Sequence, residues 1–307
     1  MILPDQFKKL VEDMSGNGAV RYRYNSPLSQ ISTFRIGGDA DVIVYPKTLS
    51  VAKHLIAGAK ECGVRYDVFG NCSNVLFDDK GYRGAVILTG DMSSVTVSGN
   101  ILTAECGASL VSVTLAAEKA GLSGLEFAYG IPGSVGGAVY MNAGAYGGEM
   151  SDVVLSTEFV TRDMAVGCLS GADHRFGYRK SAYSEGAGFL LSATFGLIPA
   201  EKAVIRSKMD EFMQKRREKQ PLEYPSAGSA FKRYPGFYTA KLIDDAGLKG
   251  FSVGGAQVSS KHAGFIINKG GATSADVHEL VRIIKEKIYE KNGINIECEI
   301  ISVPEKA

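Results

Sequence analysis

The run Gly130-Ile-Pro-Gly-Ser-Val-Gly-Gly137 is the densest glycine cluster of the chain, and Gly70-Asn-Cys-Ser-Asn74 forms a second cluster nearer the N-terminus. Glycine permits positive φ angles and a close approach of the backbone to a ligand, so such runs turn several backbone N–H groups into one concavity. In the longer run, Pro132 stiffens the entry. We therefore expect both clusters to bind an anionic group such as the diphosphate of a dinucleotide.

Neither cluster carries a common nucleotide-binding motif. No G-x-G-x-x-G opens a helix directly after a strand at the start of the chain, and G-x-x-x-x-G-K-[ST] is missing as well. Each cluster alone also fits a crowded turn. The presence of two clusters, with Met141-Asn142 just beyond the second, favours a cofactor site outside the usual nucleotide folds.

Away from the clusters, the spacing of apolar residues predicts a mixture of strands and helices. The expected strands cover residues 40–46, 65–69, 85–89, 95–98, 101–105, 153–160, 189–195, 256–258 and 265–267. The expected helices cover residues 50–62, 109–120, 201–220 and 238–246, followed by a long helix that begins at Thr273 or Ser274. Gly121 and Pro221 stop two of them, and Val277, Leu280, Val281, Ile284 and Ile288 line one face of the last.

The length of 307 residues exceeds what one core comfortably supports, so two or three domains are expected. The pattern changes near residue 91, and the charged helix over residues 201–220 bridges into a last region. We place the domains at residues 1–90, 91–200 and 201–307, in an α+β protein.

Composition excludes several classes of protein. Apolar residues make up 45% and charged residues 22%, which is typical of a globular protein. The 34 Lys and Arg against 33 Asp and Glu leave a net charge of +1, so nothing attracts nucleic acid globally. The chain has no run of about 18 apolar residues and no signal segment, which indicates a cytoplasmic protein without a membrane span. No obligate protein partner is implied.

Histidine and cysteine offer no metal site. The five cysteines are widely spaced and form no C-x-x-C, as expected for reduced thiols. The four histidines are not paired at metal-ligand spacing, so we expect no metal and assign them no catalytic role. Cys72 is either a redox-sensitive thiol beside a cofactor or, as we favour, a small residue packed in a tight loop.

Taken together, the motifs of the chain resemble those of UDP-N-acetylenolpyruvoylglucosamine reductases from about residue 28 to residue 301. The motifs that carry the resemblance, in order, are Thr33-Phe-Arg-Ile-Gly-Gly38, the 70–74 cluster, Gly121-Leu-Ser-Gly-Leu-Glu-Phe127, the 130–137 cluster, Met141-Asn-Ala-Gly-Ala145, Tyr178-Arg-Lys-Ser181, Pro225-Ser-Ala-Gly-Ser-Ala-Phe-Lys232, Leu242-Ile-Asp-Asp-Ala-Gly-Leu-Lys-Gly250 and Ile296-Glu-Cys-Glu299. The chain is similar to the form of the family that lacks an inserted substrate loop.

The resemblance implies a three-domain α+β flavoprotein with a vanillyl-alcohol-oxidase-like (PCMH-type) FAD-binding fold and a C-terminal substrate-binding domain. It implies noncovalent FAD, held between the first two domains, and NADPH as co-substrate in a ping-pong reduction of UDP-N-acetylglucosamine enolpyruvate for peptidoglycan synthesis. The implied cofactor-binding residues are Gly70, Asn71, Cys72, Ser73, Asn74, Gly130, Ile131, Pro132, Gly133, Ser134, Gly136, Gly137, Asn142 and Gly144.

The same resemblance assigns three catalytic residues. Reduction of an enol ether conjugated to a carboxylate adds a hydride to the methylene carbon and a proton to its neighbour, so negative charge gathers on the carboxylate. Arg179 would hold that charge, and Glu299 would lie beside the same carboxylate and help to polarise it. Ser229 would supply the proton, with Gly228 allowing a sharp turn beside it. Tyr178, Lys232 and Arg233 are the implied substrate-binding residues.

Several residues depart from the family's pattern. Cys72 stands where glycine is commoner, and Gly264 replaces the usual Asn after His262-Ala263. Arg233, followed by Tyr234, stands where Asn is expected and adds a permanent cation near the substrate phosphates.

Two other functions compete with the reductase. A flavin oxidase of the same fold is disfavoured because Asp39, and not a flavin-attaching histidine, follows Gly37-Gly38. A nucleotide-binding regulatory module without chemistry would leave the joint occurrence of Arg179, Ser229 and Glu299 unexplained.

Overall fold

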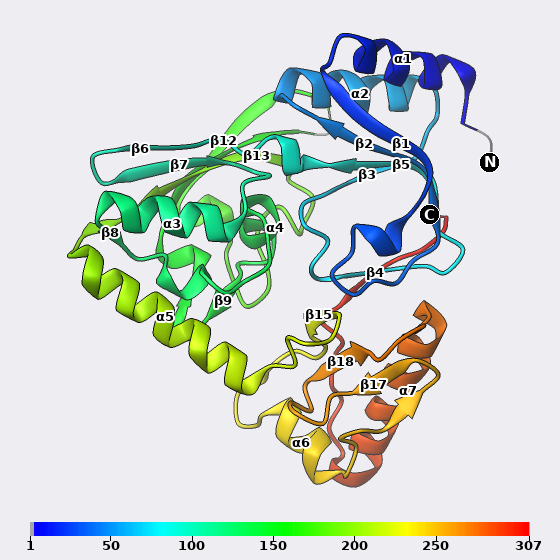
Figure 1. Ribbon diagram of the computed structural model, residues 1–307, viewed down its shortest axis with the longest axis vertical. Helices are drawn as coiled ribbons and strands as arrows, with labels where there is room; N and C mark the ends of the chain where they lie inside the picture. Colours follow the sequence, from blue (N-terminus) through cyan, green and yellow to red (C-terminus); the bar gives the residue numbers. More distant parts are fainter. Residues whose placement is uncertain (1–2, 162, 307) are drawn as a thin grey trace.

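The structure is a computed structural model that describes residues 3–161 and 163–306 (Figure 1). In this part of the chain, three sheets of four or five strands follow one another along the sequence. Helices pack on each sheet, and one short strand pair joins the third unit to the first. No helix among the described residues is long and apolar enough to cross a bilayer.

The first unit is a mixed four-stranded sheet covered on one face by two helices (Figure 1). Its strands, in spatial order, are β1 (Val20–Pro27), β2 (Asp39–Pro46), β5 (Tyr82–Leu88) and β3 (Tyr66–Phe69). The helices α1 (Asp5–Gly16) and α2 (Leu49–Glu61) bury Phe7, Val11 and Leu55 in one apolar cluster with the sheet. Pairing with β5 is parallel for both β2 and β3.

The second unit is an antiparallel five-stranded sheet with three helices packed below it (Figure 1). Its strands, in spatial order, are β12 (Val166–Ser170), β11 (Val154–Val160), β13 (Phe189–Gly196), β7 (Ile101–Glu105) and β6 (Val95–Ser98). The helices are α3 (Leu110–Ala120), α4 (Val135–Tyr140) and α5 (Lys202–Lys219). The helix stop predicted at Gly121 is confirmed, because this residue adopts φ +72° at the end of α3.

The third unit is an antiparallel sheet packed against the last helix. Its strands, in spatial order, are β15 (Ser226–Ser229), β18 (Phe265–Asn268), β17 (Ala256–Val258) and β16 (Ser252–Val253). The helices are α6 (Thr239–Asp245) and α7 (Ser274–Asn292). Thr273 caps α7 and exchanges hydrogen bonds with Asp276, which confirms the predicted start of this helix. The predicted apolar face is confirmed as well, since four of its five residues are buried.

A short parallel strand pair connects the third unit to the first. The C-terminal strand β19 (Ile301–Val303) pairs in parallel with β4 (Val75–Phe77) of the first unit. Figure 1 shows this segment, in red, running back from the third unit to the first. The remaining strands are β8 (Leu122–Ser123) with β14 (Ile198–Pro199) and β9 (Gly144–Ala145) with β10 (Gly148–Glu149), and the 3₁₀ helices are η1 (Leu28–Gln30), η2 (Thr89–Asp91), η3 (Glu126–Ala128), η4 (Met150–Asp152) and η5 (Gly171–His174).

The structure also differs from the expected elements. Helices α1 and α4 and strands β1 and β12 were not expected, and β5 begins three residues before the predicted strand. The expected loop over residues 130–137 ends early, because α4 begins at Val135. The Ser134 side chain accepts a hydrogen bond from Gly137 N at 3.3 Å, and this cap lets a helix start inside a glycine-rich run.

Candidate active site

The two glycine clusters lie against each other. A Cβ atom placed on Gly70 would lie 1.9 Å from Ser134 Oγ, so only glycine fits at this contact. Asn71 Nδ2 donates to the carbonyl oxygen of Pro132 at 3.3 Å. The loop after β3 and the loop before α4 therefore form one surface, although about 60 residues of chain separate them.

The joined loops present backbone donors without protein acceptors. Among the described residues, the N–H groups of residues 71–74 and of Gly133 and Ser134 donate no hydrogen bond to the protein. The next two N–H groups, of Val135 and Gly136, are already bonded to Ala108 and Cys106. Unpaired backbone donors on adjoining loops suit an anion such as a diphosphate. The residues present thus fit the phosphates of the expected cofactor.

Three of the predicted cofactor-binding glycines also lie close to other segments of the protein. A Cβ on Gly130 would lie 2.8 Å from the Arg216 side chain, and one on Gly144 would lie 2.8 Å from Glu149 Cβ and from the carbonyl oxygen of Gly148. A Cβ on Gly136 would lie 3.1 Å from the carbonyl oxygen of Cys106. Close approach of protein segments accounts for these glycines without a ligand.

The side chain of Cys72 lies in the apolar core, while its backbone belongs to the glycine-rich loop. Its φ of +48° lies in the left-handed region, which explains why glycine suits this position. The thiol is buried in the apolar cluster below the loop, and burial raises its pKa to about 12. A thiol held in its neutral form inside the core supports the packing interpretation over a redox role.

Arg179 and Glu299 form a short, largely buried ion pair. Arg179 Nε donates to Glu299 Oε1 at 2.6 Å, and the two side chains are 19% and 9% exposed. In the part of the chain described, the two terminal amino groups of Arg179 have no hydrogen-bond partner, and neither is buried. The carboxylate fixes one edge of the guanidinium and leaves the other edge open to a second anion.

Ser229 ends strand β15, next to the contact that holds Glu299. Glu299 N donates to the carbonyl oxygen of Ala230 at 2.8 Å. Gly228, where we expect the backbone to turn sharply, has φ +77° and lies at a register shift inside β15. The Ser229 hydroxyl has no hydrogen-bond partner among the described residues and is not buried, so it is free to donate.

The glycine loop, β15 and the Glu299 segment are joined by direct hydrogen bonds. Asn74 Nδ2 donates to the carbonyl oxygen of Glu299 at 3.3 Å, and Ile301 N donates to that of Asn74 at 3.0 Å. Thr33 Oγ1 donates to the carbonyl oxygen of Ser226 at 2.8 Å, and Thr33 N donates to that of Cys72. Motifs from both ends of the sequence thus meet at one place.

The three predicted substrate-binding residues lie near the Arg179–Glu299 pair, and they differ in their hydrogen-bond partners. The Tyr178 hydroxyl accepts from Arg233 N at 2.8 Å, and the Arg179 guanidinium lies 5.2 Å from the centre of the Tyr178 ring. Lys232 Nζ donates to Glu297 Oε2 at 2.7 Å, and this bond raises the pKa of the lysine. The exposed Arg233 side chain makes no ion pair with any described residue.

The side-chain amide of Asn142, a predicted cofactor-binding residue, is bonded within the protein. Its Nδ2 group donates to Glu149 Oε1 at 3.0 Å and to the carbonyl oxygen of Gly177 at 3.1 Å, while its Oδ1 atom accepts from Ser151 N at 2.9 Å. The residue is 1% exposed. Both amide hydrogens are therefore used within the protein, and the side chain contacts the Arg179 turn.

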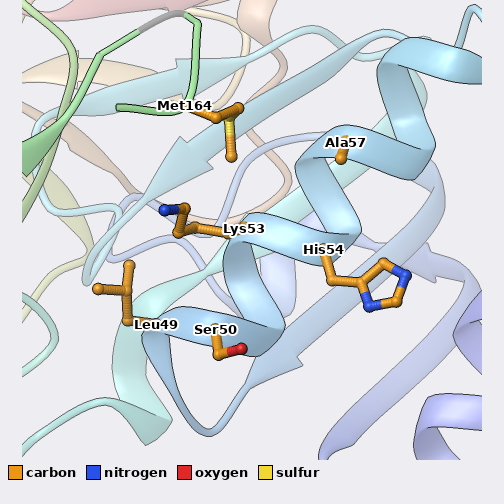
Figure 2. Close-up of a pocket in the computed structure, with 6 residues that line it drawn as sticks. All are labelled: Leu49, Ser50, Lys53, His54, Ala57 and Met164. Atoms are coloured by element: carbon orange, nitrogen blue, oxygen red, sulfur yellow. The ribbon is translucent and has the colours of Figure 1, made fainter. Parts of the chain in front are cut away.

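Two pockets lie away from the predicted residues. One, of about 550 Å³, is formed by α2 and Met164; Figure 2 shows Lys53 and Met164 facing the same space while the His54 ring points away. The other, of about 330 Å³, is lined by basic residues of the third unit, including Lys241, Lys249 and His262. Lys241 and Lys249 are each paired with a neighbouring aspartate. Neither pocket shows a constellation for catalysis.

Comparison with known proteins gives family matches over two long parts of the chain. A family model described as the C-terminal domain of UDP-N-acetylenolpyruvoylglucosamine reductase matches residues 220–303, and one described as an FAD binding domain matches residues 40–166. These matches confirm the predicted α+β flavoprotein fold, with an FAD-binding part followed by a distinct C-terminal domain.

Relatives of this chain are similar over nearly their full length. The UDP-N-acetylenolpyruvoylglucosamine reductase of Caldicellulosiruptor bescii is 50% identical and covers 92% of this chain and 91% of its own. The reductase of Streptococcus pneumoniae is 43% identical, with 95% and 96% covered. The crystal structure of the Thermus caldophilus reductase superimposes with a TM-score of 0.79 at 35% identity, covering 93% of this chain and 99% of that one.

Proposed function

The chain belongs to the UDP-N-acetylenolpyruvoylglucosamine reductase family, and on this basis we propose that it reduces UDP-N-acetylglucosamine enolpyruvate to UDP-N-acetylmuramate. The cofactor of the proposed reaction is noncovalent FAD, and NADPH is the hydride donor. The observation that carries the proposal is the 2.6 Å contact between Arg179 and Glu299, beside the strand that ends at Ser229.

The backbone donors of residues 71–74 and 133–134 would hold the FAD diphosphate, because they are the unpaired N–H groups of two adjoining loops. When bound, the flavin supplies two-electron transfer between the nicotinamide donor and the substrate. The side chains of this chain then have three tasks: to bind the substrate, to stabilise negative charge and to deliver a proton.

Arg179 performs the electrostatic task in this proposal. Negative charge collects on the substrate carboxylate as the double bond is reduced, and the free terminal amino groups of Arg179 can bind that carboxylate through two hydrogen bonds. Glu299 already holds the Nε edge of the guanidinium, so little reorganisation remains when the substrate binds. This preorganisation is the reason for pairing the cation with a protein carboxylate.

Ser229 performs the proton transfer. Its accessible hydroxyl would donate to the carbon that bears the carboxylate, while solvent or a neighbouring group restores the proton afterwards. A serine hydroxyl is a weak acid, so its competence depends on how closely it is held to that carbon. The Glu299–Ala230 hydrogen bond fixes the residue that follows Ser229.

Tyr178, Lys232 and Arg233 form the proposed binding site for the nucleotide diphosphate. Arg233 offers an unpaired guanidinium, and its backbone N–H holds the Tyr178 hydroxyl with the hydroxyl hydrogen still available. Lys232 would exchange its bond to Glu297 for a phosphate oxygen. We place the activity in the cytoplasm, in peptidoglycan precursor synthesis, with the small-molecule substrate as the partner of the chain.

The proposal is tested by the colour and redox behaviour of the purified protein. We expect a yellow protein that releases FAD on denaturation, loses its flavin absorbance with NADPH under anaerobic conditions and regains it with the enolpyruvyl nucleotide. NADH serves as the control for donor preference. A colourless protein that cannot be reconstituted would refute the flavin site, and reoxidation by oxygen as fast as by substrate would favour the oxidase alternative.

A further inference from the structure

The turn that carries Arg179 is hydrogen-bonded at both of its ends to one short segment. On the N-terminal side of the turn, Asn142 Nδ2 donates to the carbonyl oxygen of Gly177 at 3.1 Å. On its C-terminal side, Ser181 Oγ donates to the carbonyl oxygen of Tyr140 at 2.8 Å. The Asn142 and Ser181 residues are 1% and 0% exposed. Residues 140–142 thus form hydrogen bonds with residues at both ends of the turn.

The backbone of Arg179 requires such support. Its φ of +55° lies in the left-handed region, where a residue with a Cβ atom is strained. Within the turn, Gly177 and Lys180 exchange two backbone hydrogen bonds of 3.0 and 3.1 Å. These two bonds close the turn, but they do not orient it relative to Glu299. Only contacts to the rest of the protein can do so.

The orientation of the Asn142 amide is determined by its neighbours. Ser151 N can only donate, so the Asn142 atom that it meets at 2.9 Å is the oxygen. The NH₂ group is thereby turned toward the two acceptors, Glu149 Oε1 and the carbonyl oxygen of Gly177. Asn142 itself has φ +42°, a conformation that Asn tolerates better than most residues.

The same segment continues directly from the expected diphosphate loop. Helix α4 starts after its cap, Ser134, and is six residues long. Its last turn leads into the segment through Asn142 N, which donates to the carbonyl oxygen of Val139 at 3.2 Å. One short helix therefore separates the unpaired backbone donors from the contacts that hold Arg179.

From this geometry we propose that Asn142 and Ser181 are positioning residues for the reduction of the substrate. They hold the 177–180 turn so that the terminal amino groups of Arg179 face the substrate carboxylate. The inference rests on the proposed function, because it acts through the role assigned to Arg179. Asn142 acts on the reaction through Gly177 and not by contact with the cofactor.

Two substitutions remove the contacts separately. Asn142→Gly deletes the amide while accepting the left-handed backbone, and Ser181→Ala deletes the hydroxyl that bonds to Tyr140. Ser192→Ala is the matched control, because Ser192 is a half-buried serine of β13 whose hydroxyl bonds to Glu158 at 3.2 Å, in the sheet of the second unit. If Asn142→Gly does not fold, Ser181→Ala carries the test alone, because it removes the other hydrogen bond that holds the turn.

The first experiment measures both half-reactions of each holoenzyme by anaerobic stopped-flow absorbance. We expect reoxidation by the enolpyruvyl nucleotide to slow by about 10- to 100-fold in Asn142→Gly and Ser181→Ala, because small displacements of a binding group have effects of this size. Bleaching by NADPH should stay within about twofold, as should both rates of Ser192→Ala. In an Arg179→Ala background, the same two substitutions should add less than about threefold, since they act through the deleted side chain.

A second readout does not depend on turnover. Hydrogen exchange of the peptide that spans residues 177–182 should be faster in Asn142→Gly and Ser181→Ala than in Ser192→Ala and the parent. Equal slowing of both half-reactions, additivity with Arg179→Ala or unchanged exchange of the turn would overturn the proposal. If Arg179→Ala alone reoxidises at the parental rate, the role proposed for Arg179 fails, and the positioning proposal fails with it for that separate reason.

Discussion

Glu297 and Glu299 lie two residues apart in the sequence, yet their ion pairs differ strongly in exposure to solvent. The Lys232–Glu297 pair is 2.7 Å long, and its side chains are 37% and 62% exposed. The Arg179–Glu299 pair is 2.6 Å long, and its side chains are 19% and 9% exposed. Water can replace either partner of the exposed pair, whereas the buried pair loses its compensation when one partner is removed.

The difference indicates what each pair is suited to do. A solvated lysine can exchange a protein carboxylate for a ligand phosphate with little change in free energy. A guanidinium fixed at its Nε edge inside the protein cannot move easily, but it can offer its other edge to a substrate carboxylate in a fixed orientation. We therefore interpret the exposed pair as adaptable binding and the buried pair as preorganised catalysis.

Removing the buried cation should have the largest effect on the reaction. In Arg179→Ala we expect kcat/KM for the enolpyruvyl nucleotide to fall about 10²- to 10³-fold, as when one donor to a developing negative charge is lost. Arg179→Lys keeps the charge but loses the two-pronged geometry, so it should recover only part of the rate. Steady-state NADPH oxidation measures both. A loss of less than about threefold in Arg179→Ala would contradict the assignment.

Removing the buried carboxylate should have the next largest effect. Glu299→Gln keeps the size of the side chain but weakens its hold on Arg179 Nε, so we expect kcat to fall about 10- to 100-fold. The free energy of unfolding should fall by about 1–3 kcal/mol, because the guanidinium is left partly buried without its partner. Chemical denaturation provides this value. Unchanged kcat with a large loss of stability would indicate a purely structural pair.

Substitutions at the exposed pair should have the smallest effects on kcat and on stability. We expect Lys232→Ala to raise KM for the nucleotide by about three- to tenfold with little change in kcat, through loss of one phosphate contact. Glu297→Gln frees Lys232 and should leave KM unchanged or lower it. Thermal unfolding should hardly respond to either substitution. If Lys232→Ala instead lowered kcat as much as Glu299→Gln does, the two pairs would not differ in the proposed way.

The buried side chain of His174 should make the stability of the fold depend on pH. His174 is 0% exposed; its Nε2 lies 2.9 Å from Thr157 Oγ1, and its Nδ1 lies 3.1 Å from the carbonyl oxygen of Gly171. Burial lowers its pKa in the folded protein, so the unfolded chain takes up a proton first as pH falls. The stability it provides is present above the unfolded pKa of about 6.5 and is lost below it.

Because the pKa of His174 is lowered by folding, removing this histidine should make stability fall less as the pH is lowered. We expect the fall in Tm between pH 7 and pH 5 to be smaller in His174→Gln than in the parent, while His54→Gln, at an exposed position, serves as control. His262, whose pKa is also lowered by burial, keeps part of the pH dependence in both variants. An identical fall in Tm for parent and His174→Gln would show that His174 does not titrate with unfolding.

Local signals in the sequence account for the elements that were predicted. Gly121 and Thr273 mark helix ends through their own conformation and side chain, so neighbouring residues suffice to find them. Strand β1 also had a local signal that was not used, since Val20, Tyr22 and Tyr24 alternate with two arginines. Helix α4 had little signal beyond its Ser134 cap, because glycine disfavours helix.

The site itself depends on contacts that no local pattern carries. Arg179 and Glu299 are 120 residues apart, and only the resemblance to a family brought them together before the structure. The resemblance also implies that Asn142 binds the cofactor, but it gave no sign that the side-chain amide is bonded to Gly177, 35 residues away. The direction in which a buried amide points is a property of the packed fold, which sequence spacing does not encode.

One measurement tests the central claim, that Arg179, Glu299 and Ser229 form a single site for reducing the bound substrate. The holoenzyme of Ser229→Ala is mixed first with NADPH and then with the enolpyruvyl nucleotide, and flavin absorbance is followed without oxygen. We predict bleaching at the parental rate followed by no recovery on the time scale on which the parent recovers fully. Recovery at the parental rate, or loss of both phases together, would contradict the account.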